Sequence, residues 1–242
     1  MSGTKAVALV IGAGEHLGSG IAERFAKEGF HIVATRRRGD LGELGARVTA
    51  HGVGFTGLHT DARDEDAVKA LVEEIETQIG AIEVMIFNAG GNVRFPFLET
   101  TTRVYRKVWE MCTLGGFLNA RECADRMVQR GRGTIIFTGA TASVRGAAGF
   151  AAFAGAKHAL RATAQSMARE LAPHGVHVAH VVIDGAIENK NTRELFPDFF
   201  ENRPDDAVLQ PEELAEIYWN IYRQPRRAWS FETDVRTYAE PW

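Results

Sequence analysis

The sequence predicts an α/β fold: a doubly wound parallel sheet of about seven strands with helices on both faces. Short runs rich in Val, Ile and Phe alternate with longer amphipathic segments along the whole chain. Parallel neighbours need crossover connections, and strands covered on both faces are apolar throughout, so this alternation is typical of such a sheet. No internal repeat or low-complexity linker interrupts the pattern, and residues 1–242 are expected to form one domain.

The strands are expected where β-branched and aromatic residues gather in runs of five to eight. Each run follows a turn or a helical segment, as the alternation requires. In chain order, the expected strands are residues 6–11, 31–36, 54–59, 82–88, 134–138, 177–183 and 229–236.

The helices are expected where apolar residues recur every three or four positions. In the first, Leu17, Ile21 and Phe25 recur at intervals of four and mark one buried stripe. The expected helices are residues 17–28, 64–79, 101–130, 151–172 and 211–222.

One long irregular segment, residues 186–209, follows the sixth expected strand and is rich in Asn, Asp, Pro and Phe. An insert at the carboxyl edge of a sheet forms a substrate lid in some proteins and a plain surface connection in others. Both interpretations stay open. Under a lid, the side chains of Phe95, Phe196, Phe199 and Phe200 would make the substrate pocket apolar, although they fit an ordinary core equally well.

The composition is that of a globular protein, with 45% hydrophobic residues, 24% charged residues and a net charge of −3. This near-neutral balance argues against nucleic acid or a membrane as the main partner and leaves a small molecule. The N-terminus lacks a signal-peptide cleavage region, and no apolar run approaches 18 residues. Cys112 and Cys123 lie too far apart on one expected helix for a disulfide. We therefore expect a reduced, cytoplasmic protein.

A glycine turn joins the first strand to the first helix in V-A-L-V-I-G-A-G-E-H-L-G, residues 7–18. Glycines at this junction let the backbone approach a pyrophosphate, which the amides and dipole of the helix N-terminus then hold. The pattern predicts a Rossmann-type nucleotide site. Its contacts are expected from Gly12, Gly14, His16, Leu17 and Gly18.

The second strand ends in A-T-R-R-R, residues 34–38. A carboxylate at this position selects NAD by binding the ribose 2′-hydroxyl, whereas a basic residue accommodates the 2′-phosphate of NADP. Thr35 offers a hydroxyl and Arg36 a fork-shaped cation, while Glu15 would repel the phosphate. Three arginines outweigh one glutamate, and the cofactor is predicted to be NADP(H). The alternative is a solvated basic turn.

The glycine turn resembles the T-G-x-x-x-G-x-G fingerprint of the short-chain dehydrogenase/reductase (SDR) superfamily, with Ile11 for the threonine and His16 for the middle glycine. The resemblance extends over nearly the whole chain. It implies that Asp61 bonds the adenine and that Asn88-Ala89-Gly90 matches the N-A-G motif beside the nicotinamide ribose. Asp184-Gly185 stands where the family has Pro-Gly, and the amide of Ile187 is expected to hold the carboxamide.

The segment G-A-A-G-F-A-A-F-A-G-A-K-H-A-L, residues 146–160, resembles the SDR active-site helix, which carries Tyr-x-x-x-Lys. Lys157 matches the lysine that holds the ribose, but Phe153 replaces the tyrosine acid and has no hydroxyl. The asparagine position falls on Cys112. The serine position falls on Ala140, with Thr141 and Ser143 close enough to supply a hydroxyl if the loop shifts. Three of the four family roles are vacant.

Two other side chains, Cys112 and Asp184, are candidates to replace the missing catalytic groups. Cys112 is either a nucleophile or a small buried helix residue, and the second is favoured. Asp184 is either a carboxyl with a raised pKa that exchanges protons or a residue that caps a turn. All four tyrosines (Tyr105, Tyr218, Tyr222 and Tyr238) are expected far from the catalytic face.

The resemblance thus implies an NADP(H)-dependent oxidoreductase with a degenerate catalytic set and an unidentified substrate, which the phenylalanines above suggest is apolar. The alternative is a silent NADP(H)-binding pseudoenzyme that acts as a sensor or subunit partner. A third hypothesis is a lyase or isomerase with Asp184 as base. Long helices and the last strand resemble SDR assembly surfaces, which implies a homodimer or homotetramer with Trp109 and Phe117 as contacts.

Overall fold

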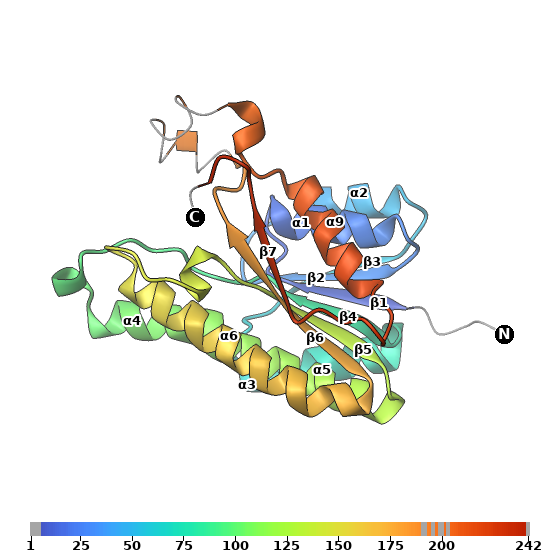
Figure 1. The fold of residues 1–242 in the computed structure, drawn as a ribbon. Coiled ribbons are helices and arrows are strands. Elements are labelled where there is room, and N and C mark those ends of the chain that lie inside the picture. Colours follow the sequence, from blue (N-terminus) through green and yellow to red (C-terminus); the bar gives the residue numbers. More distant parts are fainter. Residues whose placement is uncertain (1–5, 190–192, 195–196, 198–200, 202–203, 241–242) are drawn as a thin grey trace.

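The computed structural model describes residues 6–189, 193–194, 197, 201 and 204–240. Its centre is one seven-stranded sheet in the order β3-β2-β1-β4-β5-β6-β7 (Figure 1). Every neighbouring pair is parallel. The predicted doubly wound α/β fold is confirmed. In chain order the strands are β1 (Val7–Ile11), β2 (His31–Arg36), β3 (Phe55–His59), β4 (Ile82–Phe87), β5 (Gly133–Thr138), β6 (Val176–Asp184) and β7 (Glu232–Arg236).

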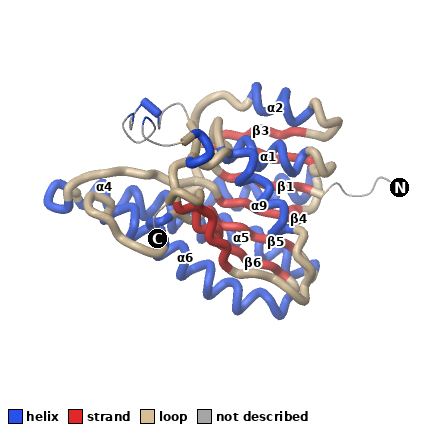
Figure 2. Tube along the Cα trace, turned by 45° about the horizontal axis from the view of Figure 1, so that its top comes forward, coloured by secondary structure: helices blue, strands red, loops and turns tan. Residues whose placement is uncertain are grey.

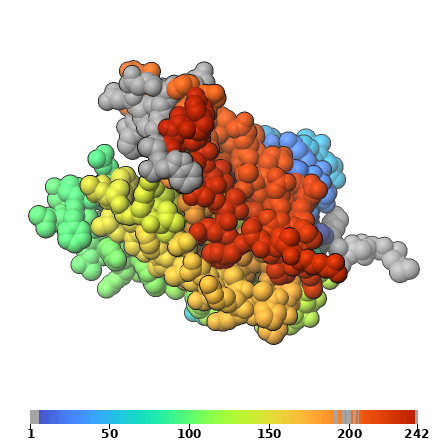
Figure 3. Space-filling model, in the orientation of Figure 1, coloured from blue at the N-terminus to red at the C-terminus, as the bar shows by residue number. Residues whose placement is uncertain are grey.

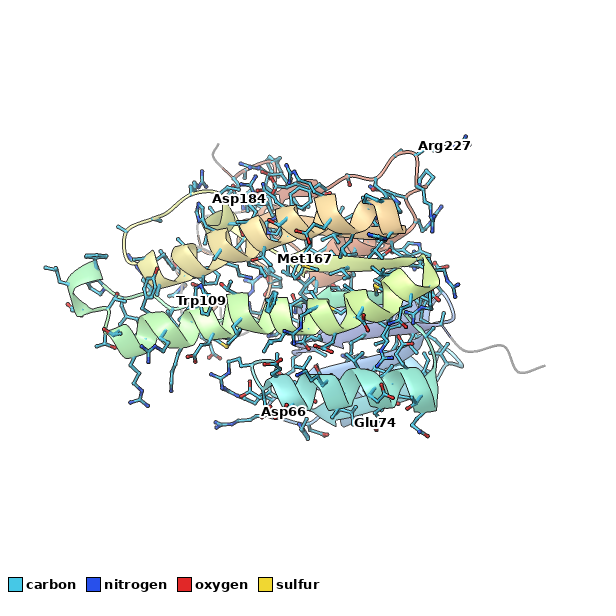
Figure 4. The ribbon with its side chains drawn as sticks, turned by 90° about the horizontal axis from the view of Figure 1, so that it is seen from below. Asp66, Glu74, Trp109, Met167, Asp184 and Arg227 are labelled. Atoms are coloured by element: carbon cyan, nitrogen blue, oxygen red, sulfur yellow. The ribbon has the colours of Figure 1, made fainter. Side chains whose placement is uncertain are left out.

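Helices cover both faces of this sheet (Figure 2). One face packs against α1 (Leu17–Ala26), α2 (Gly42–Thr49) and α9 (Pro211–Tyr222) through a core that includes Phe25, Ile86 and Tyr218. On the opposite face, α3, α4–α5 and α6 lie side by side (Figure 4). Their bounds are α3 (Glu65–Glu74), α4 (Thr102–Trp109), α5 (Gly115–Arg130) and α6 (Ala151–Leu171).

The long helix predicted over 101–130 contains a π-helical turn, Glu110–Leu114, between α4 and α5. A second π-helical turn, Ile75–Ile79, ends the helix predicted over 64–79. Such turns insert one extra residue into the helix and are frequent at functional sites. The first one carries Cys112, which is fully buried.

Two elements differ from the predictions. The helix α2 was not expected, because it is only eight residues long and contains two glycines, although Leu44 and Val48 form its buried stripe. The last strand begins at Glu232 and is three residues shorter than predicted, because Trp229 stacks on His177 instead of pairing in the sheet.

The segment 186–209 is described in part. Ile187 pairs with Leu209 in a parallel bridge, which ties the start of this segment to its end. A short 3-10 turn, Asp205–Ala207, precedes the bridge. Phe196, Phe199 and Phe200 lie outside the described residues, so the predicted lid pocket is a proposal. Phe95 is 40% exposed and belongs to no buried core.

The C-terminal segment lies on the surface between α6 and α9 (Figure 3, red). Trp109 and Phe117 are 40% and 39% exposed on the helical layer. Both cysteines are buried and free. Within the part of the chain that the structure describes, no helix is long and apolar enough to cross a bilayer.

Candidate functional site

A cleft of about 590 Å³ opens at the carboxyl edge of the sheet, above the ends of β1, β4, β5 and β6. The strand order reverses between β1 and β4, and ligands of doubly wound sheets bind at this switch point. Of the predicted site residues, those that line the cleft are Gly14, His16, Leu17, Gly18, Asn88, Gly90, Thr141, Phe153, Lys157, Gly185 and Ile187.

The glycines of the turn have two different surroundings: some pack closely against the backbone, and one faces open space. Gly12 has φ +83°, and a Cβ there would lie 2.7 Å from the backbone nitrogen of Ala89. A Cβ on Gly18 would lie 2.6 Å from the Gly12 carbonyl oxygen. A Cβ on Gly14, in contrast, would meet nothing within 4 Å. Gly12 therefore supports the turn from behind, and Gly14 leaves the space that an approaching phosphate needs.

The N-A-G segment fastens this turn to β4. The amide of Asn88 donates to the Ile11 carbonyl (2.8 Å), and its side-chain Nδ2 donates to the Gly12 carbonyl (3.0 Å). Gly90 then brings the chain close to Lys157, because a Cβ there would lie 3.5 Å from the lysine Nζ. The N-A-G motif therefore fixes the position of the glycine turn relative to Lys157.

Thr35 and Arg36 lie outside the lining of this cleft. Thr35 is buried, and its carbonyl accepts from the amides of Gly12 (2.9 Å) and Ala13 (3.0 Å). The Arg36 guanidinium donates to the carbonyls of Arg38 (2.5 Å) and Asp40 (3.0 Å), which fixes the turn after β2. Thr35 thus orients the glycine turn through its backbone rather than through its hydroxyl.

Asp61 is held by Arg63. The guanidinium donates to both carboxylate oxygens, at 2.9 and 2.6 Å, and these hydrogen bonds lower the pKa of Asp61 to about 2. Asp61 does not line the cleft, and its oxygens keep lone pairs for one further donor.

Lys157 lies at the floor of the cleft, 4% exposed, and its Nζ donates to the Thr138 carbonyl (2.8 Å). Burial lowers the pKa of this amine. One turn earlier on α6, Phe153 points into the same cleft, so the two positions of the Tyr-x-x-x-Lys pattern share one face of the helix.

The model for the family described as short chain dehydrogenase matches residues 6–198. The chain belongs to the short-chain dehydrogenase/reductase superfamily. An enzyme named 1-deoxy-11-beta-hydroxypentalenate dehydrogenase from Streptomyces exfoliatus is 30% identical over 233 residues, which cover 95% of this chain and 84% of the relative.

Two solved structures place the fold in the same superfamily. A short-chain dehydrogenase from Rhodopseudomonas palustris is 46% identical, with a TM-score of 0.83 over 96% of this chain and 99% of that one. A variant of actinorhodin polyketide ketoreductase, solved with NADPH, is 25% identical, with a TM-score of 0.86 over 96% of each chain.

The serine position of this SDR chain is Ala140, and the nearby hydroxyls are already engaged. Thr141 lines the cleft, but its Oγ1 donates to Asp184 Oδ1 at 2.5 Å, so its single proton points away from a substrate oxygen. Ser143 is fully buried, and its Oγ accepts from the Ala140 amide (3.1 Å). In this structure Ser143 closes the 3-10 turn behind the cleft, so a shift of the loop is still needed before it could supply a hydroxyl to the site.

The contacts of Asp184 favour a structural role for its carboxylate over a proton-exchanging one. It is 2% exposed at the end of β6, lies beside α6 in Figure 4, and does not line the cleft. Its Oδ2 pairs with Arg236 Nη1 (3.1 Å), and its Oδ1 lies 3.3 Å from Arg145 Nη2. Two cations and the Thr141 hydroxyl surround the carboxylate, which therefore joins the loop after β5 to the last strand.

Cys112 and Tyr218 are buried close to Lys157 without reaching the cleft. The full burial of Cys112 away from the cleft lining favours the interpretation of a small buried residue, although the Lys157 amine lies near enough to interact electrostatically with its thiol. Tyr218 exchanges a hydrogen bond with Thr138 Oγ1 (2.8 Å), and burial raises the pKa of its phenol. The expectation that all four tyrosines lie far from the catalytic face is thus wrong for Tyr218, two hydrogen bonds from Lys157.

Sequence reasoning missed Asn92, Arg145 and Phe150, which also line the cleft. They lie in loops after β4 and β5, where no periodicity marks a side chain as inward or outward. Their only signal was position, since the loops at the carboxyl edge of a parallel sheet surround its ligand site. Among the described residues, no group of three His, Cys, Asp or Glu could hold a metal ion.

Proposed function

We propose that the protein is an NADP(H)-dependent oxidoreductase of the SDR type that transfers a hydride without a tyrosine acid. The observation that carries this proposal is Lys157. An amine with one hydrogen bond is costly to bury, and it is retained at the floor of the cleft although the tyrosine it would assist is absent. Positioning the nicotinamide ribose is the role that remains for it.

The residues present fit a dinucleotide. Gly14 leaves open space at the N-terminus of α1, where backbone amides and the helix dipole favour phosphate. His16 lines the same wall and is a further donor for a phosphate oxygen. Gly185 and Ile187 line the same cleft. When bound, NADPH supplies the hydride; the actinorhodin ketoreductase holds this nucleotide in the same fold.

The 2′-phosphate of NADP(H) is expected at the turn after β2. Arg36 stands there with two of its nitrogens on backbone carbonyls, and the neighbouring Arg37 acts electrostatically on Asp61. Arg36 Nη2 forms an ion pair with Glu15 Oε1 at 3.9 Å, and this pair is weak because the Glu15 side chain is largely exposed. These contacts support NADP(H) over NAD(H).

The absence of the tyrosine restricts the classes of substrate that the protein could reduce. General acid catalysis contributes about 10²–10⁴-fold, whereas proximity contributes roughly 7–11 kcal/mol of the barrier. The cleft can still bring the reactants into proximity, but it lacks the general acid because Phe153 has no proton to donate. Substrates that need the least proton assistance are cationic or electron-poor, such as iminium ions and quinones.

The first experiment is a fluorescence titration of the purified protein with NADPH and NADH. NADPH-selective binding, followed by NADPH oxidation with an imine or quinone from a panel, supports the proposal. If the protein binds NADPH but turns over none of the imines, quinones and carbonyls, the proposed oxidoreductase activity is unsupported. Absence of binding to either nucleotide would refute the cofactor site itself.

The second candidate is a pseudoenzyme that binds NADP(H) without turnover. The donation of the Thr141 proton to Asp184 and the burial of Ser143 outside the cleft lining favour it, since neither hydroxyl is available to a substrate. Restoring the family residues separates the two candidates, as argued in the Discussion.

For assembly and location we propose a cytoplasmic homodimer or homotetramer. Trp109 and Phe117 are exposed about two turns apart on the helical layer, a surface that association would cover. Sedimentation of the wild type beside the Trp109→Lys, Phe117→Lys variant tests it: the variant is expected to dissociate, and a monomeric wild type would contradict the proposal.

A further inference from the structure

The lining of the cleft carries only basic titratable side chains. Among the described residues that surround it, these are His16, Arg145 and Lys157, and none is an aspartate or glutamate. His16 belongs to the glycine turn and Lys157 to the floor beside Gly90. Arg145 is therefore a cation of the cleft that the proposed dinucleotide contacts do not use.

Arg145 lies at the end of the cleft away from the glycine turn. It follows the 3-10 turn Thr141–Ser143 in the connection from β5 to α6. The glycine turn follows β1, and β4 separates β1 from β5 in the sheet. Two strand spacings, roughly 10 Å, therefore lie between the two connections. This end of the cleft is where a substrate would lie beyond the dinucleotide.

The guanidinium of Arg145 is held by Asp184 through one nitrogen only, which leaves its other donors available. Its Nη2 lies 3.3 and 3.5 Å from the two oxygens of Asp184. The same carboxylate has closer partners in Thr141 Oγ1 (2.5 Å) and Arg236 Nη1 (3.1 Å). Within the described part of the chain, Nε and Nη1 of Arg145 have no protein partner, and its side chain is 46% exposed. The arginine is held in place and keeps donors for a ligand.

The surfaces next to this cation are apolar. Ala142, Ala147, Phe150 and Phe153 line the cleft with it. An ionic contact strengthens where apolar walls exclude water, and the planar donors of arginine match a carboxylate. A ligand with an apolar body and one carboxylate fits both features.

We propose that Arg145 binds a carboxylate group of the substrate and so selects carboxylate-bearing acceptors over their neutral analogues. This inference rests on the proposed function, in which the cleft holds the substrate beside NADP(H).

The experiment is isothermal titration calorimetry with benzoate and benzamide, with and without NADP⁺. The two probes share an apolar ring and differ in charge. Wild-type protein is expected to bind benzoate about tenfold more tightly, less so as NaCl rises, because salt screens an exposed ion pair. Arg145→Gln is expected to remove the preference and keep benzamide affinity, and Arg145→Lys to keep part of it.

The control is Arg132→Gln, which removes another exposed arginine (58% against 46% for Arg145) whose partner Glu83 lies outside the cleft lining. It is expected to leave the preference unchanged. Equal affinities for the two probes, no detectable benzoate binding, or an unchanged preference in Arg145→Gln overturns the inference. A preference that depends on Arg145 in a protein that binds neither NADPH nor NADH would refute the proposed function and leave the carboxylate site standing.

Discussion

The Nζ of Lys157 lies 5.8 Å from the centroid of the Phe153 ring, one helical turn away on α6. In SDR enzymes this pair of positions holds an amine and a phenol, and the amine lowers the pKa of the phenol. Here the amine faces a ring without a hydroxyl. The charge of Lys157 has no proton transfer to promote and acts on whatever binds in the cleft.

Restoring two family residues is expected to create a carbonyl reductase. In Ala140→Ser, Phe153→Tyr, the phenol extends from a ring that already lines the cleft. General acid catalysis should then raise kcat/KM for NADPH-dependent reduction of an ordinary ketone by about 10²–10⁴-fold. Steady-state kinetics measure the gain, and Ala140→Ser, Phe153→Leu is the matched control. A wild type as active as the restored variant would exclude the pseudoenzyme candidate.

Lys157→Met is expected to weaken NADPH binding at least tenfold, because it removes the cation and keeps a side chain of similar length. The Thr138 carbonyl loses its donor, which costs about 1–3 kcal/mol of unfolding free energy. Fluorescence titration gives the affinity and urea denaturation the stability. Lys107→Met, on an exposed turn of α4, is the control. Unchanged NADPH affinity in a folded Lys157→Met protein would show that the lysine does not hold the cofactor.

Arg36→Gln is expected to reduce the preference for NADPH over NADH about tenfold, because the 2′-phosphate loses one charge-assisted contact. NADH affinity should change little. The two dissociation constants measured at low and physiological salt check this, with Arg103→Gln as a control of equal charge change far from β2. A parallel loss for both nucleotides would instead mean that Arg36 acts only by fixing the turn through the carbonyls of Arg38 and Asp40.

Local patterns were sufficient to predict the strands and the glycine turn. All seven strands lie within three residues of their predicted bounds, because β-branched runs between turns leave few alternatives in a buried parallel sheet. Gly12 and Gly18 were singled out by spacing, and the structure supplies the steric reason.

Contacts between distant segments were not predictable in the same way. The buried carboxylate of Asp184 is stabilised by contacts with Thr141 and Arg236, which are 43 and 52 positions away in the chain. Tyr218 reaches Thr138 across 80 positions. No periodicity encodes such pairs, since they depend on how loops at one edge of the sheet close over each other. For this reason the sequence alone left both interpretations of Asp184 open.

His180 gives the last prediction, on stability against pH. Its ring is fully buried on β6, and Nδ1 lies 3.1 Å from Glu232 Oε2. Within the described atoms, Nε2 has no hydrogen-bond partner. Burial lowers the pKa of His180 to about 4, from about 6.5 in an unfolded chain. Between these values the unfolded chain binds a proton that the folded protein does not, so the free energy of unfolding falls as pH falls through 6.5 and levels off near 4.

Between pH 7.5 and pH 5, His180 is expected to account for a loss of about 2 kcal/mol at most. His180→Gln removes the titration and keeps a donor for Glu232, so its unfolding free energy should depend less on pH. Urea denaturation at the two pH values measures the difference. Both pH values lie above the range in which Glu232 titrates in the folded protein, since hydrogen bonds from Arg161 lower the pKa of that carboxyl.

His177→Gln is the matched control for this experiment. Burial also lowers the pKa of His177, on the opposite face of the same strand, but its Nε2 bonds the Ser230 carbonyl, which favours the charged ring and opposes the shift. Its substitution should therefore flatten the pH dependence less than that of His180. Equal slopes for the wild type and His180→Gln would mean that the buried imidazole accepts a proton in the folded state, with Glu232 as its counter-charge.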